Sequence, residues 1–295
     1  MTDSVLSTYT AEDGENLAMF EWALPERKNP RGVVIIVHGL GEHAGRYDHV
    51  AQRLNSWGFA VRAYDQYGHG DSAGLRGTLS SPTRLLDDLA DVVDSTRERT
   101  RARVPIIVLG HSMGGLVAAR FVSLKIRPVD ALVLSSPALD PGLNWFQKAL
   151  LTVLPAFAPD LCVGNGLDAK YISHDPAVVK AYEADMLVHD RISGLLARFI
   201  ADSGPATVAL AKRWTVPTLL MYAGADKLVN PAGSRVFGAA APPRTVMTKC
   251  FDKLYHELFN EVDREQVFAF MQRWLDQRVP LAATAPAAGF QAKTA

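Results

Sequence analysis

The stretch from Val104 to Arg120 constrains the fold of this chain more than any other. It begins with an apolar, β-branched run, Ile106–Leu109, which is typical of a buried strand. After Gly110-His111-Ser112-Met113-Gly114 the sequence continues as a helix-compatible segment, Leu116–Leu124. A serine between two glycines at such a strand-to-helix turn is the pattern of a nucleophile elbow. We therefore expect Ser112 in a strained backbone conformation, with its hydroxyl exposed at the carboxyl edge of a sheet.

Ser72 lies in a second match to the same G-x-S-x-G pattern, Gly70–Gly74. The pattern is short, and composition alone predicts roughly one chance match in ten chains of this length. Ser72 follows the polar stretch 65–70 and is followed by more loop, Leu75–Pro82. Ser112, in contrast, has a strand before it and a helix after it. We interpret Ser112 as the nucleophile and Ser72 as a loop residue.

Strands and helices alternate along most of the chain. The order strand, helix, strand, helix predicts a mostly parallel, doubly wound α/β sheet. Two runs on either side of Glu12–Glu15 predict an opening β-hairpin. The eight predicted strands cover Val5–Thr10, Leu17–Trp22, Gly32–Val37, Phe59–Tyr64, Ile106–Leu109, Val129–Leu134, Val216–Tyr222 and Arg244–Phe251.

Two of the predicted helices carry specific signals. Ser81 is predicted to cap a helix that runs to about Arg99, with Pro82 at its first position. The last helix is predicted over about Asn260–Arg278. Its inward face is predicted to comprise Val262, Val267, Phe270 and Trp274.

Between residues 139 and 204 the alternation stops and no convincing strand is present. Leu143–Pro155 is strongly apolar, and amphipathic helices are predicted at Pro176–Met186 and Arg191–Ala201. An insertion of this length is expected to form a helical cap over the strand ends, where ligands bind. The predicted organisation is therefore a core of residues 1–138 and 205–280, a cap of residues 139–204, and a disordered, Ala/Pro/Thr-rich tail of residues 281–295.

Composition bounds the class of protein. The 295 residues are 48% apolar, which suffices for one large core. Lys+Arg and Asp+Glu are 31 each, so net charge gives no argument for nucleic acid or an anionic membrane. Met1–Thr10 lacks the pattern of a signal peptide, and no window is apolar enough to span a bilayer. Cys162 and Cys250 are not in metal-ligand spacing, and we expect two unbridged thiols in a cytoplasmic protein, with one disulfide as the alternative.

A serine nucleophile needs a base, and the base needs an orienting acid. In sheets with this elbow both follow the nucleophile, in the order acid, histidine. His174 and His189 fall in the predicted cap, whereas His256 directly follows a predicted strand. We predict His256 as the base; the alternative is a surface loop histidine.

Asp226 is the predicted acid, because it follows the strand that ends at Tyr222 and precedes a new helix. Asp252 is the alternative, although its place in the same loop as His256 makes it the weaker candidate. The tetrahedral intermediate also needs backbone N–H donors. The positions that supply them in this fold correspond to Met113, after the nucleophile, and Leu40, after the strand that ends at Val37.

Five motifs together resemble the monoacylglycerol lipase family of α/β-hydrolases. They are His38-Gly-Leu-Gly-Glu-His-Ala-Gly-Arg-Tyr47, Asp65-Gln-Tyr-Gly-His-Gly-Asp-Ser72, Gly110-His-Ser-Met-Gly-Gly115, Gly224-Ala-Asp226 and Tyr255-His-Glu-Leu258. The resemblance covers about Val5 to Arg278. It implies an α/β-hydrolase fold with a cap that holds an acyl chain, and hydrolysis of monoacylglycerols, lysolipids or short esters without metal or cofactor.

The resemblance also assigns individual residues. Leu40 and Met113 would supply the oxyanion hole. Glu42 and Arg46 would stand near the polar glycerol end of the substrate, and His111 would line the pocket. For each of these three side chains the alternative is a purely structural role.

Several functions stay open at this stage, because fold does not fix substrate. A general carboxylesterase, lysophospholipase, thioesterase or aminopeptidase would share the elbow. A non-catalytic ligand receptor is disfavoured because no member of the triad is missing, and an epoxide hydrolase or dehalogenase would carry aspartate in place of Ser112. We expect a small lipid ester as substrate, no nucleic-acid partner, and weak peripheral membrane contact through the cap; the oligomeric state stays open.

Overall fold

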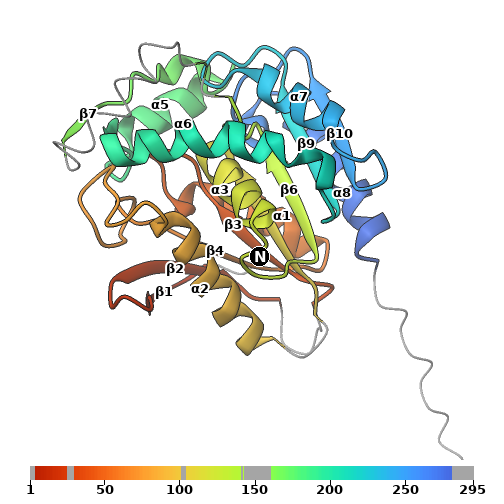
Figure 1. The fold of residues 1–295 in the computed structure, drawn as a ribbon, viewed down its shortest axis with the longest axis horizontal. Coiled ribbons are helices and arrows are strands. Elements are labelled where there is room, and N and C mark those ends of the chain that lie inside the picture. The colour runs from red at the N-terminus through yellow and green to blue at the C-terminus, as the bar shows by residue number, and fades with distance from the viewer. Residues whose placement is uncertain (1–3, 25–29, 101–103, 141, 143–160, 281–295) are drawn as a thin grey trace, which may run out of the picture.

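The computed structural model describes residues 4–24, 30–100, 104–140, 142 and 161–280. In this part of the chain eight strands form one sheet in the order β1-β2-β4-β3-β5-β6-β9-β10 (Figure 1). β2 pairs antiparallel with both β1 and β4, and all other neighbours are parallel. The predicted eight-stranded, mostly parallel sheet is confirmed. The strands are β1 Val5–Thr10, β2 Asn16–Trp22, β3 Val33–Val37, β4 Ala60–Tyr64, β5 Ile106–His111, β6 Ala131–Ser135, β9 Thr218–Ala223 and β10 Val246–Phe251.

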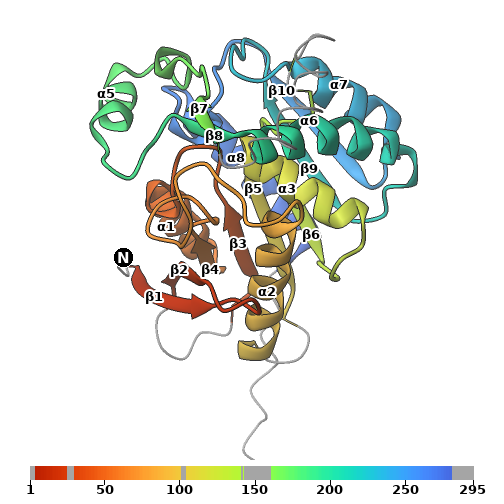
Figure 2. The same ribbon diagram turned by 60° about the vertical axis from the view of Figure 1, so that its left-hand side comes forward.

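Helices cover both faces of the sheet (Figure 2). One core lies under α1 (Asp48–Ser56) and α8 (Arg264–Arg278). The other lies under α2 (Arg84–Arg99), α3 (Ser112–Ser123), α6 (Gly194–Ala209) and α7 (Pro231–Ala240). Alternate residues of β3 enter the two cores, and all five are buried, because a central parallel strand is covered on both sides.

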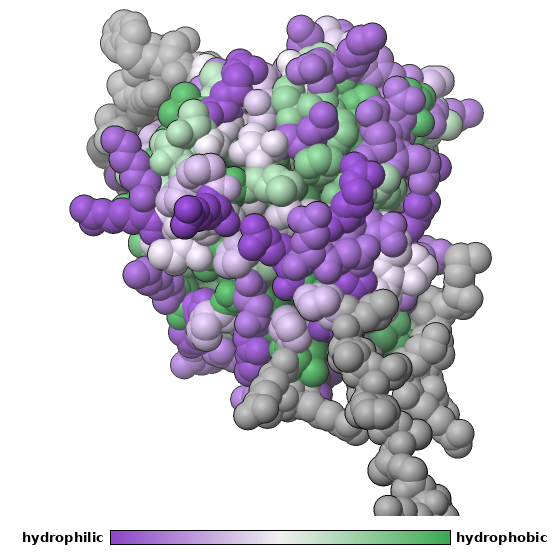
Figure 3. Space-filling model, turned by 90° about the vertical axis from the view of Figure 1, so that its right-hand side faces the viewer, coloured by the Kyte–Doolittle hydropathy of each residue, from purple (hydrophilic) through white to green (hydrophobic). Residues whose placement is uncertain are grey.

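The side of the molecule that bears α7, α8 and β10 shows polar and apolar side chains interspersed (Figure 3). β10 is an edge strand of the sheet, and its middle residues Thr248 and Lys249 are exposed. A lysine on an edge strand opposes pairing with another chain.

The segment between β6 and β9 contains two strands that the sequence did not predict. β7 (Cys162–Gly164) pairs antiparallel with β8 (Arg191–Ser193). The expectation of a cap without strands was therefore wrong, because three residues are too few to show an alternating pattern. Between these strands lie the 3₁₀ turn η2 (Ala169–Tyr171) and α5 (Pro176–Ala184). The apolar run Leu143–Pro155 and the predicted tail at 281–295 lie outside the described residues.

Three predicted helix starts need correction. Ser81 and Pro82 form a turn in which the Arg84 N–H donates to the Ser81 carbonyl, so α2 begins only at Arg84. The helix expected from Arg191 begins at Gly194, because Arg191–Ser193 pairs as β8 and the Ser193 hydroxyl accepts from the Leu196 N–H.

The last helix is also shifted. The 3₁₀ turn η4 covers Leu258–Asn260, and α8 starts at Arg264. Val262, predicted to face inward, therefore lies before the helix and is exposed, while Phe270 is only partly buried. Phe268 and Met271 occupy the buried face together with the predicted Val267 and Trp274.

The described part of the chain contains no helix that is both long and apolar enough to cross a membrane. Cys162 lies in β7 and Cys250 in β10, and neither forms a disulfide. The expectation of two unbridged thiols is thus met.

Candidate active site

Ser112 stands at the junction of β5 and α3, with a backbone φ of 53°. A non-glycine residue in this left-handed region carries strain of about 1–3 kcal/mol. Glycines on either side make the turn possible. A Cβ at Gly110 would lie 2.4 Å from the Gly114 oxygen, and a Cβ at Gly114 would lie 2.2 Å from the Val37 oxygen. The helix therefore packs directly on the end of β3 and presents Ser112 at the carboxyl edge of the sheet.

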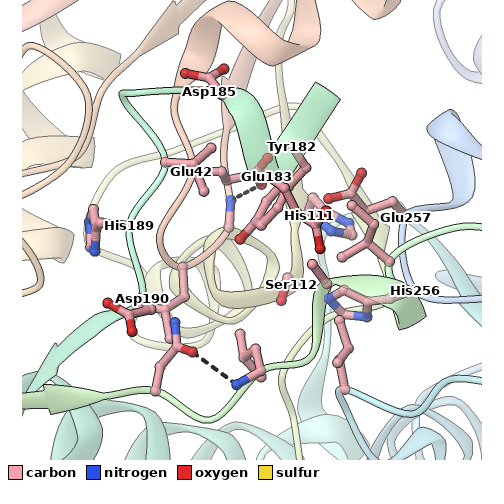
Figure 4. A pocket seen from close by; sticks show the side chains of 18 residues that line it. Glu42, His111, Ser112, Tyr182, Glu183, Asp185, His189, Asp190, His256 and Glu257 are labelled. Carbon is pink, nitrogen blue, oxygen red and sulfur yellow. Dashed lines mark hydrogen bonds between the residues drawn. The ribbon is translucent and has the colours of Figure 1, made fainter. Parts of the chain in front are cut away.

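The structure brings Ser112, Asp226 and His256 to the same edge. Ser112 and His256 both line one cavity (Figure 4). The Nδ1 atom of His256 lies 2.7 Å from Oδ2 of Asp226. The other carboxylate oxygen of Asp226 accepts the N–H groups of Leu228 and Val229, at 2.9 and 3.0 Å. Asp226 is thus held on both sides and its carboxylate is nearly inaccessible.

The loops that carry the acid and the base are joined to each other. The Gly224 N–H donates to the Phe251 carbonyl, and the Ala225 N–H donates to the Leu254 carbonyl. A Cβ at Gly224 would lie only 2.6 Å from the Cα of Asp252, so the two loops touch at this point. Asp252 itself is exposed, and the carboxylate that reaches His256 is Asp226.

The electrostatics of this pair favour a charged acid beside a basic imidazole. Burial alone would raise the pKa of Asp226, but His256 and the two backbone N–H groups outweigh it and hold that pKa below its ordinary value. Burial alone would lower the pKa of His256, but Asp226, with Glu257 and Glu42, holds it above the ordinary value. Because Nδ1 is engaged by Asp226, Nε2 is the nitrogen of His256 available for proton transfer.

The loop after β3 lies against Ser112. A Cβ at Gly39 would lie 3.2 Å from the Ser112 Cβ. The Gly39 N–H donates to Oε1 of Glu42, whereas the N–H of Leu40 meets no acceptor within the described residues. Met113 is the second residue of α3, where helix N–H groups have no intrahelical partner. Leu40 and Met113 therefore both belong to segments that adjoin Ser112.

The buried side chain of His38 holds this loop through two hydrogen bonds. Its Nδ1–H donates to the Gly39 carbonyl at 2.8 Å, and its Nε2 accepts the Gln66 N–H at 2.9 Å. Complete burial lowers the pKa of His38 to about 3, so the imidazole stays neutral and its tautomer is set by these two bonds.

The cavity beside Ser112 has a volume of about 240 Å³ and is notably acidic. Five carboxylate residues line it, and no lysine or arginine appears among its described lining residues. His189 and Asp190 stand across the cavity from His256 and Glu257 (Figure 4). The five are Glu42, Glu183, Asp185, Asp190 and Glu257.

The three side chains that the resemblance placed near the substrate differ in position. Glu42 and His111 line the cavity; Arg46 does not. The ring of His111 lies 4.7 Å from that of His256, centroid to centroid, and burial beside His256 lowers the pKa of His111 to about 4. Arg46 is enclosed by Glu42 and Glu257 instead.

Ser72 is used within its own loop. Its hydroxyl donates to the Asp65 carbonyl at 2.5 Å and accepts the Ala18 N–H at 2.8 Å. It is therefore a structural loop residue, as the sequence context indicated.

Most of the cavity residues were given no role by the sequence analysis, Tyr182 and Glu257 among them. Tyr182 comes from α5, and its place in the chain carries no chemical signal. Glu257 stands directly after His256, and that adjacency was the one available hint of its role. Among the described residues, no group of three or more His, Cys, Asp or Glu side chains is arranged to hold a metal ion.

The sheet, the elbow and the acid–histidine pair define an α/β-hydrolase. A family described as serine aminopeptidase, S33, matches residues 28–263. A monoacylglycerol lipase of Mycolicibacterium smegmatis is 37% identical, over 84% of this chain and 89% of its own length. An uncharacterized abhydrolase domain-containing protein of Dictyostelium discoideum is 34% identical over 95% of this chain, which spans only 30% of that longer relative.

A solved structure is equally similar. The crystal structure of Paleococcus ferrophilus monoacylglycerol lipase shares 36% identity, covers 89% of this chain and 99% of its own, and superposes with a TM-score of 0.79. The chain belongs to the serine aminopeptidase S33 family of α/β-hydrolases, within the group that includes the monoacylglycerol lipases. The family predicted from the five motifs is thereby confirmed.

Proposed function

We propose that this protein hydrolyses carboxylic esters of lipids, monoacylglycerols foremost, through an acyl-enzyme on Ser112. His256 is the base, Asp226 the orienting acid, and the N–H groups of Leu40 and Met113 form the oxyanion hole. The observation that carries the proposal is the Asp226–His256 hydrogen bond. His256 lines the same cavity as Ser112, whose backbone is strained.

The chemistry follows from the order of contacts. As Ser112 Oγ attacks the ester carbonyl carbon, its proton passes to Nε2 of His256, and Asp226 stabilises the imidazolium. The oxyanion accepts the two backbone N–H groups. His256 then returns the proton to the leaving glycerol oxygen as the C–O bond breaks. Water repeats the attack on the acyl-enzyme and releases the fatty acid.

The cavity lining supports a neutral head group. Carboxylates gathered in a cleft create a negative potential that opposes a phosphate and tolerates the hydroxyl groups of glycerol. Five carboxylates line this cavity, with no described basic side chain in its lining, and Arg46 just outside it compensates only part of the charge of Glu42 and Glu257. A monoacylglycerol therefore fits better than an anionic lysophospholipid.

Hydrolysis of a matched substrate series tests this assignment. We expect kcat/KM for a monoacylglycerol to exceed that for lysophosphatidic acid of the same acyl chain by at least about tenfold, which corresponds to roughly 1.4 kcal/mol. A p-nitrophenyl ester of the same chain serves as the head-group-free reference. Equal rates on the anionic lipid would overturn the head-group assignment, and no hydrolysis of any ester would overturn the function itself.

We further propose that residues 139–204 act as the cap and contribute the acyl-chain site. Three apolar or aromatic side chains of this segment line the cavity: Ile172, directly after η2, Tyr182 of α5, and Val188, between α5 and β8. Helix α6 continues across residue 204 as far as Ala209 and packs on α3, so the end of the cap and the start of the core share this helix.

We also propose a weak peripheral membrane contact through the same end of the molecule. Val163 of β7 is 52% exposed, and Met186, after α5, is 95% exposed. An apolar side chain that enters lipid gains about 1.5–3 kcal/mol at most, so the contact is reversible. Net charge is zero, and the association is expected to be insensitive to salt.

Co-sedimentation with phosphatidylcholine vesicles measures this contact. The double variant Val163→Asp/Met186→Asp is expected to lower the bound fraction several-fold without changing hydrolysis of a soluble short-chain ester. Val236→Asp is the matched control, because Val236 is 55% exposed on α7, on the other side of the molecule. Equal losses from both variants would contradict a contact located at the cap.

A further inference from the structure

Arg46 sits at the centre of a nearly buried ion-pair network beside the cavity. Its guanidinium donates to both carboxylate oxygens of Glu257, at 2.8 Å each, and to Oε2 of Glu42 at 2.5 Å. The side chains of Arg46, Glu42 and Glu257 are only 11%, 5% and 7% exposed. Bidentate, charge-assisted contacts of this kind fix geometry as well as charge.

The two carboxylates of this network, Glu42 and Glu257, belong to two different loops of the proposed active site. Oε1 of Glu42 accepts the Gly39 N–H, directly before Leu40, and the hydroxyl of Tyr47 at 2.7 Å. Glu257 directly follows His256, and its own N–H donates to the Ile172 carbonyl of the cap at 2.8 Å. One guanidinium therefore joins the loop of the oxyanion donor to the loop of the base.

Helix α5 of the proposed cap also contacts the guanidinium of Arg46. The ring of Tyr182 from α5 lies over the guanidinium, with its centroid 4.7 Å from Cζ of Arg46. Tyr182 also lines the cavity. A cation–π contact of this geometry, partly shielded from water, is favourable by about 0.5–2 kcal/mol.

We propose that Arg46 is a positioning residue, which keeps the Leu40 loop and the His256 loop in their mutual register and anchors α5 over them. This inference rests on the proposed roles of Leu40 and His256. The positioning role takes the place of the expected contact between Arg46 and the glycerol of the substrate. The guanidinium lies outside the cavity lining and is already held by two carboxylates. A displacement of about 1 Å between reacting groups can lower a rate about 10²-fold, so the loss of Arg46 acts on kcat.

The test compares Arg46→Ala, Arg46→Lys and Glu257→Gln on a p-nitrophenyl ester and a monoacylglycerol. We expect Arg46→Ala to lower kcat about 10²-fold, as for a displacement of that size, and to leave KM within about threefold. Arg46→Lys is expected to recover only part of kcat, because lysine cannot make the bidentate contact. Millimolar guanidinium ion is expected to restore part of the Arg46→Ala rate. The double variant Arg46→Ala/Glu257→Gln is expected to be no slower than Arg46→Ala alone, since both remove the same contact.

Arg53 provides the matched control. It makes a bidentate pair with Glu265 at 2.7 and 2.7 Å and lies over the ring of Phe268 at 4.7 Å, away from the cavity. Arg53→Ala is expected to keep kcat and to be unaffected by guanidinium ion. If Arg46→Ala raises KM with kcat unchanged, or if guanidinium restores nothing, the positioning role is overturned. A wild-type protein that hydrolyses no ester would instead overturn the proposed function. If Arg46→Ala fails to fold, Glu257→Gln, which keeps size and shape, takes its place in the same comparison: a lower kcat at unchanged KM supports the positioning role, and an unchanged kcat overturns it.

Discussion

Replacing Ser112 with alanine is expected to lower kcat for ester hydrolysis by about 10⁶-fold, as loss of the nucleophile does in a well-studied serine protease. The reason is that no acyl-enzyme can form without the hydroxyl. A fluorophosphonate probe should label Ser112 in the wild type and nothing at that position in the variant. Residual turnover about 10³–10⁴ above the uncatalysed rate is expected, because the oxyanion donors and substrate binding persist.

Ser72→Ala is the control for this experiment, since Ser72 occupies the second copy of the same pattern. Loss of its hydroxyl removes the bonds to Asp65 and Ala18, which should cost about 0.5–1.5 kcal/mol each and lower the melting temperature. Turnover at a temperature where the variant is folded should stay close to that of the wild type. An active Ser112→Ala, or a folded but inactive Ser72→Ala, would contradict the assignment of the nucleophile.

Asp226→Asn is expected to lower kcat by about 10⁴-fold while leaving the fold intact, because an amide no longer selects the correct tautomer of His256. Asp252→Asn, a change of the same kind in an exposed residue of the His256 loop, should leave kcat within about twofold, since surface changes outside such networks have small effects. Melting temperatures of both variants separate lost chemistry from lost stability. Comparable losses in the two variants would contradict the choice of acid.

The pH profile of Asp226→Asn gives an independent readout. In the wild type the pKa of His256 is held above its ordinary value, so kcat/KM is expected to fall as pH drops through a point above about 6.5, where the imidazole becomes protonated and cannot accept the serine proton. Without the charge of Asp226, burial dominates and lowers the pKa of His256. The acid limb should therefore move to lower pH in Asp226→Asn and stay in place in Asp252→Asn. A limb that does not move would show that Asp226 does not interact with the base.

The sheet could be predicted because its strands carry local signals. Buried runs such as Val33–Val37 and Ile106–Leu109 are recognisable without their partners, and the alternation with helices then dictates parallel pairing. The strand–turn–helix context also sufficed to select Ser112 over Ser72. The sequence positions of Asp226 and His256, each after a strand, anticipated the loops that the structure brings into contact.

What could not be predicted depends on contacts between distant segments. β7 and β8 have three residues each and exist only because they pair with one another. One of the two partners of Arg46, Glu257, stands 211 positions away, and nothing in the sequence connects Arg46 with it. α8 begins only at Arg264, after η4, so Val262, which the apolar period predicts to face inward, lies before the helix and is exposed. The acidity of the cavity likewise arises from side chains of three separate loops and α5.

The elbow and its two partners also couple activity to the completion of folding. Ser112 follows a central strand, whereas Asp226 and His256 follow β9 and β10, which close the far edge of the sheet. Contacts of such long sequence separation form late, since chain closure must precede them. A partly folded chain in which β9 and β10 are not yet paired therefore has the nucleophile turn but lacks the acid and the base, and it is inactive. Recovery of turnover during refolding would report the docking of the last two parallel strands, long after most secondary structure has returned.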